Sequence, residues 1–235
     1  MIFVVGSGRT GTHFLTRALL QNPEIVDPFN GRENKALFKS NTMAAFENRK
    51  TPPAGARLFY KVAERIRRKQ FIDQTHPNLF FGDWILQELP SAKMLFPIRD
   101  TRQTVASMIA HPSVSGWYQR LEEFPFPNQA FGLLARSELD QMSITEKCAL
   151  RVVTTRNYGY KLAERASGRL MTVDYDRLVT DEETVLSEVF DFVGVSRKDN
   201  LSGTAKPSSL TKWQEQLSNR QLEEIQRIED RYLDR

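Results

Sequence analysis

The chain has 235 residues, a length that suits one domain, and its 40% hydrophobic and 26% charged residues exclude a largely disordered protein. The net charge of +4 is too small to indicate nucleic-acid binding. No apolar run is long enough to cross a membrane, the apolar N-terminus lacks the features of a signal peptide, and the single cysteine is typical of a reducing compartment. We therefore expect a cytoplasmic protein.

The predicted elements begin with a short buried strand over residues 2–5, which ends at Gly6. The helical spacing of Leu15, Ala18 and Leu19 predicts a helix over residues 12–21. Further strands are expected at 58–62, 71–72, 94–98 and 170–173, and further helices at 83–89, 102–110, 183–193 and 219–232. This alternation predicts a single α/β domain with a central parallel sheet flanked by helices.

Two stretches do not fit the alternation. Residues 28–57 carry proline, glycine and asparagine and are expected to be irregular. Residues 111–150 contain three prolines and several aromatic side chains, and we expect a helical or irregular lid there. Both stretches would lie near the carboxyl ends of strands, where open α/β sheets bind ligands.

The strongest motif is the glycine-rich segment Gly-Ser-Gly-Arg-Thr-Gly-Thr at residues 6–12, between the first strand and the first helix. Glycines let such a loop turn its N–H groups toward an anion at the helix N-terminus. In the Walker pattern, the lysine position would be Thr12 and the magnesium-ligand position would be His13, while the only cation of the loop is Arg9. The segment therefore favours a phosphate-type ligand bound without magnesium.

A second motif follows the strand predicted at residues 94–98. Arg99 stands at the strand end, and Ser107 comes two turns along the next helix. Both side chains could hold one phosphate. An Arg99–Asp100 pair that only caps the helix is the simpler reading of this motif taken alone.

Together the two motifs resemble the bacterial-type sulfotransferases, which use 3′-phosphoadenosine 5′-phosphosulfate (PAPS) and have a P-loop NTPase-like fold. In that superfamily a (Lys/Arg)-(Ser/Thr)-Gly-(Ser/Thr) loop binds the 5′-phosphosulfate, and a later Arg-Asp-x-Arg…Ser segment binds the 3′-phosphate. Residues 73–78, 89–93, 173–178 and 208–213 are similar to further family segments in the same order. The resemblance implies one sulfotransferase domain over residues 1–235, with the lid at about 111–150 as an acceptor-site insertion.

Carried over by position, the resemblance implies a donor site at the glycine loop, the second motif and the C-terminal segment. His13 departs from the hydroxyl residue that is usual at its position, and Gln74 replaces a family lysine. The implied donor-site residues are Gly8, Arg9, Thr10, Gly11, Thr12, His13, Phe14, Arg99, Ser107, Tyr175 and Lys212.

The implied reaction is an in-line transfer of a sulfuryl group to an acceptor hydroxyl or amine, with no metal. Arg9 is the candidate for stabilising the leaving group, and Glu33 and His76 are the candidates for the general base that takes the acceptor proton. A small-molecule or glycan acceptor is favoured, and a peptide stays open. The alternatives are a P-loop kinase or nucleoside triphosphatase, and a nucleotide-binding domain without catalysis.

Overall fold

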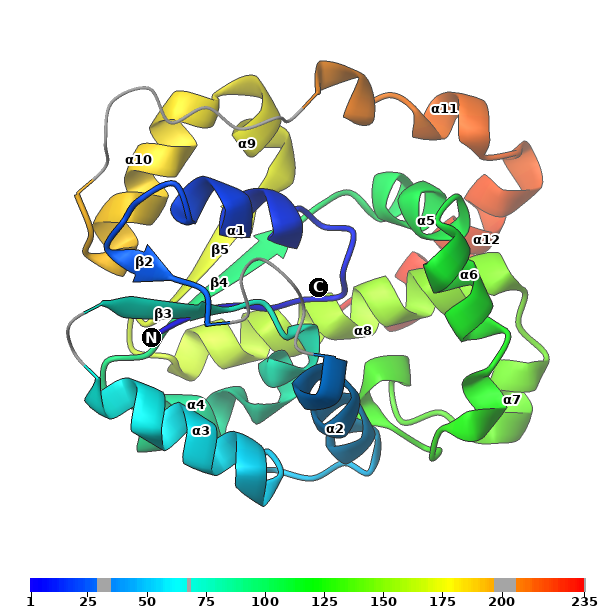
Figure 1. The fold of residues 1–235 in the computed structure, drawn as a ribbon. Coiled ribbons are helices and arrows are strands. Elements are labelled where there is room, and N and C mark those ends of the chain that lie inside the picture. The colour runs from blue at the N-terminus through cyan, green and yellow to red at the C-terminus, as the bar shows by residue number, and fades with distance from the viewer. Residues whose placement is uncertain (29–34, 67–68, 197–205, 235) are drawn as a thin grey trace.

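The computed structural model describes residues 1–28, 35–66, 69–196 and 206–234. In these ranges five parallel strands form one sheet in the order β2-β3-β1-β4-β5 (Figure 1). The strands are β1 (Ile2–Val4), β2 (Ile25–Val26), β3 (Gln70–Asp73), β4 (Lys93–Ile98) and β5 (Leu170–Asp174). The predicted α/β fold with a central parallel sheet is confirmed.

The central strand β1 contributes to both hydrophobic cores. Phe3 and Val5 pack into the larger core on one face, and Ile2 and Val4 pack into the smaller core on the other. This alternation follows from the two-residue repeat of a strand. All four side chains are fully buried, as expected for a central strand of a parallel sheet.

Helices cover both faces of the sheet (Figure 1). Helices α1 and α10 pack on the face of the smaller core, whereas α3, α4 and the long α8 lie on the other face. The α-helices are α1 (Thr12–Leu19), α2 (Lys35–Phe46), α3 (Ala54–Arg65), α4 (Gly82–Glu88), α5 (Thr101–Ile109), α6 (Pro112–Tyr118), α7 (Arg136–Asp140), α8 (Ile144–Arg165), α9 (Tyr175–Thr180), α10 (Glu182–Val193), α11 (Trp213–Gln216) and α12 (Asn219–Tyr232); 3-10 turns occupy His76–Phe81, Leu121–Glu123, Gln129–Phe131 and Pro207–Ser209. No helix in the described ranges is long and apolar enough to cross a membrane.

Most predicted elements agree with the structure to within a few residues. The strand predicted at 58–62 is wrong, because these residues belong to α3. Leu58 and Val62 are exposed, while Ala56, Tyr60 and Ala63 are buried at a spacing of four and three residues. That spacing is helical. The apolar run at 58–62 therefore contains residues from both the buried and the exposed face of one helix.

The expectation of irregular structure over 28–57 is also wrong for most of its described part. Helix α2 fills residues 35–46, and α3 begins at residue 54 after Pro53. Helix α2 contains Ser40, Asn41 and Thr42 in succession, which lower helix propensity, and its sequence pattern is only weakly amphipathic. Tertiary packing of Ala44, Ala45 and Phe46 stabilises it instead.

Residues 111–143 contain short helices and turns that pack against the main core, and residues 144–150 already belong to the long α8. Phe131 is fully buried, and Trp117 stacks on it with ring centroids 6.1 Å apart. Phe46 of α2 contacts both rings edge to face. The segment is thereby joined to α2, and Trp117 is held at the border between packed core and open space.

Candidate active site

The two motifs meet because their strands are neighbours. Strands β1 and β4 pair in parallel, with Val4 beside Leu95. The glycine loop follows β1 and Arg99 follows β4, so both emerge at the carboxyl edge of the sheet. In the sheet, β2 and β3 lie on one side of β1, and β4 and β5 lie on the other, so the order of the strands reverses at β1. This is the topological switch point at which open α/β sheets bind ligands.

The glycine loop is shaped to bind an anion. Gly8, Arg9 and Gly11 have φ values of 77°, 61° and 106°, so the backbone turns back on itself before α1. The backbone N–H groups of residues 6–11 donate to no acceptor in the described part of the chain. The buried Oγ1 of Thr10 likewise has no partner there. These free donors at a helix N-terminus form an anion cradle.

Two arginines join the loop to the second motif. The Nε of Arg9 donates to Oγ of Ser107 at 3.1 Å, and an Nη of Arg99 donates to the carbonyl oxygen of Arg9 at 3.2 Å. Desolvation lowers the pKa of both guanidiniums, although arginine stays protonated at any physiological pH. Two partly buried positive charges therefore lie at one edge of the sheet, beside the loop.

Tyr175 and Ser209 both contact the guanidinium of Arg99. The Arg99 guanidinium stacks over the Tyr175 ring at 4.2 Å and donates to the Ser209 carbonyl oxygen at 2.7 Å. The Tyr175 hydroxyl lies 3.2 Å from Oγ of Ser209. A Cβ atom on Gly11 would lie only 2.6 Å from the Tyr175 ring, so the close approach of loop and ring requires glycine.

His76 lies beneath the glycine loop. Its Nε2 is 3.0 Å from Oγ1 of Thr12, and the residue is only 8% exposed. Burial, together with smaller contributions from the nearby positive charges of Arg151 and Arg9 and from His13, lowers the pKa of His76 to about 3. The imidazole is therefore neutral at physiological pH.

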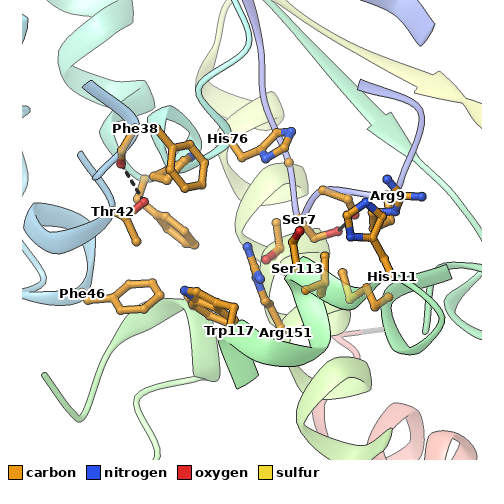
Figure 2. A pocket seen from close by; sticks show the side chains of 18 of the residues that line it. Ser7, Arg9, Phe38, Thr42, Phe46, His76, His111, Ser113, Trp117 and Arg151 are labelled. Atoms are coloured by element: carbon orange, nitrogen blue, oxygen red, sulfur yellow. Dashed lines mark hydrogen bonds between the residues drawn. The ribbon is translucent and has the colours of Figure 1, made fainter. Parts of the chain in front are cut away.

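A cavity of about 570 Å³ opens beside the loop and His76 (Figure 2). Among the described residues that line it, none is a carboxylate. Its aromatic wall is formed by Phe38, Phe46, Phe80 and Trp117, and it is also lined by Arg9, Arg151 and the imidazoles of His13, His76 and His111. The cavity thus combines an apolar surface with the positive charges of two arginines.

The structure brings most of the predicted site residues together, and three need comment. Phe14 packs in the smaller core and does not line the cavity. Lys212 is exposed on the segment after Ser209. Glu33 lies outside the described residues. The residues that do gather around the loop are Gly8, Arg9, Thr10, Gly11, Thr12, His13, His76, Arg99, Ser107 and Tyr175.

Sequence reasoning missed several residues of this site. Ser209 falls within a segment already singled out at residues 208–213, but nothing marked that serine itself. Arg151 and His111 carry no motif, and α8, which presents Arg151, was not predicted as a helix. The described ranges contain no cluster of three or more His, Cys, Asp or Glu residues that could hold a metal ion.

Solved structures of other proteins share this fold. The sulfotransferase domain from the curacin biosynthetic pathway has 14% sequence identity and a TM-score of 0.63, covering 98% of this chain and 96% of that one. The sulfotransferase domain from the Synechococcus PCC 7002 olefin synthase has 18% identity and a TM-score of 0.57, and the match covers 100% of this chain and 95% of that one. A sulfotransferase from Alicyclobacillus acidocaldarius has 16% identity and a TM-score of 0.51, and the match covers 100% of this chain and 96% of that one.

At these identities the likeness establishes the P-loop-like sulfotransferase fold. No curated protein matches the chain significantly. The model of one protein family, described as the sulfotransferase family, matches residues 2–199 and so includes β1, the glycine loop and the second motif. With a match over most of its length, the chain belongs to the sulfotransferase family and is a transferase.

Proposed function

We propose that the protein transfers a sulfuryl group from PAPS to the hydroxyl, or amine, of an acceptor. The observation that carries this proposal is the junction of the anion cradle at residues 6–11 with Arg9, Ser107 and Arg99. A donor with phosphate groups at both its 5′ and 3′ positions needs two anion sites that lie close together. The loop and the second motif supply one each.

The residues present fit such a donor. Free N–H groups and the unpartnered Thr10 hydroxyl suit the oxygens of the 5′-phosphosulfate, with Gly8, Gly11, Thr12 and His13 in the same loop. Arg99 and Ser107 would hold the 3′-phosphate, since a guanidinium and a hydroxyl are typical phosphate ligands. The adenine would lie near Tyr175, toward the segment that carries Ser209 and Lys212, whereas Phe14 packs in the smaller core.

Arg9 is suited to stabilise the leaving group. When bound, PAPS supplies the sulfuryl group and its 5′-phosphate as leaving group. The Arg9 guanidinium lines both the cradle and the cavity, and it is partly desolvated, which strengthens its interaction with developing negative charge. Because Ser107 fixes its Nε, the side chain is held in position before the donor binds.

Glu33 and His76 are the candidates for the general base. Neutral His76 can accept a proton, but a pKa of about 3 makes it a weak base in this state, which favours Glu33. The variants Glu33→Gln and His76→Asn are compared. The variant that removes the true base should lower kcat by at least about tenfold, and the other variant should lower it less. If neither change reaches tenfold, both assignments are wrong.

The donor site is tested by nucleotide binding. We expect adenosine 3′,5′-bisphosphate, the product of PAPS, to raise the unfolding temperature without magnesium, and 5′-AMP to raise it much less. Arg99→Met and Ser107→Ala should each reduce this preference for the 3′-phosphate. Arg177→Met is the matched control, because Arg177 pairs with Glu188 at the exposed surface and should leave the preference unchanged.

Two other results would contradict the proposal. A stabilisation that requires ADP and magnesium together would indicate a P-loop kinase or nucleoside triphosphatase. Binding of the bisphosphate without any consumption of PAPS, over a broad panel of hydroxyl and amine acceptors, would indicate a nucleotide-binding domain without catalysis. Family membership favours sulfuryl transfer over both.

A further inference from the structure

The cavity beside the glycine loop contains a second guanidinium that the donor site does not use. Arg151 projects from α8 into the cavity, where Figure 2 shows it beside Trp117, with Arg9 on the other side of the view. Its guanidinium lies 4.5 Å from the centre of the Trp117 ring. The aromatic ring thus fixes the position of the charge.

Arg151 has no acidic partner in the part of the chain that the structure describes. It forms no ion pair with any carboxylate in the described ranges, and none of the described residues that line the cavity is acidic. Other arginines at the edge of this region do have partners: Arg156 pairs with Glu229 and Arg102 with Asp100. A guanidinium that lines a cavity with no carboxylate beside it is available to bind an anionic group of a ligand.

The surroundings of Arg151 differ from those of the donor cluster. Arg9 and Arg99 are tied to Ser107, Tyr175 and the glycine loop at the sheet edge. Arg151 is instead held by Trp117, which packs on Phe46 and Phe131. The cation therefore belongs to the aromatic wall of the cavity.

We propose that Arg151 binds an oxyanion group of the acceptor, a carboxylate or a phosphate, while the aromatic wall formed by Phe38, Phe46, Phe80 and Trp117 holds its apolar body. This assignment rests on the proposed function, since the cavity becomes an acceptor site only if the donor occupies the glycine loop. The acceptor is then an amphiphilic acid whose hydroxyl points toward Arg9 and His76. Neutral glycans and uncharged alcohols lack the group that Arg151 requires.

Two probes of equal size test the charge requirement. We measure the Kd of 3-phenylpropanoate and of its neutral amide, 3-phenylpropanamide, by calorimetry, with and without saturating adenosine 3′,5′-bisphosphate. We expect the acid to bind about tenfold or more tightly than the amide, as a charge-assisted contact provides. 2-Phenylethyl phosphate is measured as a third probe, and tighter binding of either anion than of the neutral amide supports an oxyanion site at Arg151.

Variants assign the preference to Arg151. Arg151→Met keeps the apolar contact with Trp117 and should abolish the preference for the acid, while Arg151→Lys should retain part of it. Lys147→Met removes a positive charge one turn earlier on α8, away from the cavity, and should leave the preference intact. Unfolding midpoints of all variants are measured in parallel, and Arg151→Lys gives the test if Arg151→Met does not fold.

Several results would overturn the proposal. The amide could bind as tightly as the acid, neither probe could bind at millimolar concentration, or the preference could survive Arg151→Met. If Arg151→Met weakens PAPS but not adenosine 3′,5′-bisphosphate, Arg151 contacts the sulfuryl group and the acceptor assignment is wrong. Failure of the bisphosphate to bind the wild type overturns the proposed donor site instead, and the probe measurements without nucleotide stay interpretable.

Discussion

Replacing His76 by asparagine should change how the stability of the protein depends on pH. The folded protein holds His76 neutral, with a pKa of about 3, whereas the unfolded chain has the ordinary value of 6.5. Below pH 6.5 the unfolded state therefore binds a proton that the folded state does not, and stability is lost as the pH falls. His76→Asn removes this loss and leaves an uncharged polar side chain in its place.

The magnitude follows from the two pKa values. Between pH 7 and pH 5 the wild type should lose about 2 kcal/mol more unfolding free energy than His76→Asn, because each pH unit below the unfolded-state pKa of 6.5 is worth about 1.4 kcal/mol and the loss above that pKa is small. Urea unfolding of both proteins at the two pH values measures the difference, and contributions from other groups cancel. Equal losses in the two proteins would refute the reasoning, since they would mean that His76 titrates normally in the fold.

Two further predictions concern single small residues. Gly11→Ala should lower the unfolding free energy by about 1–3 kcal/mol more than Gly168→Ala. Both glycines have a positive φ, but only a Cβ atom at Gly11 would meet another side chain, the ring of Tyr175. Urea unfolding of the two variants measures the difference, and equal losses would show that the Tyr175 ring moves away freely. Cys148 is fully buried, and burial raises the pKa of its thiol to about 12. N-ethylmaleimide should therefore leave the native protein unmodified by mass spectrometry at pH 8 and modify it once urea is added; labelling of the native protein would contradict the buried position.

The sequence by itself determined the features whose causes are local. An apolar run bounded by Gly6 predicted the short buried strand β1, and the positive φ values at Gly8 and Gly11 agree with a glycine loop before a helix. Helix α12 was predicted with its observed bounds, since its apolar side chains recur at helical spacing after the capping residue Ser218. The order of the motifs was sufficient to identify the family, because each motif is a short segment whose chemistry depends on its own residues.

Tertiary structure decided everything that depends on residues distant in the chain. The run at 58–62 has the composition of a strand, and only packing of Tyr60 against the core makes it part of α3. The low pKa of His76 arises from burial beneath the glycine loop, which no local pattern reveals. Arg151 resembles any helix-surface arginine in the sequence. Its place in the cavity is set by how α8 crosses the sheet and by Trp117, which reaches it from a segment more than thirty residues earlier.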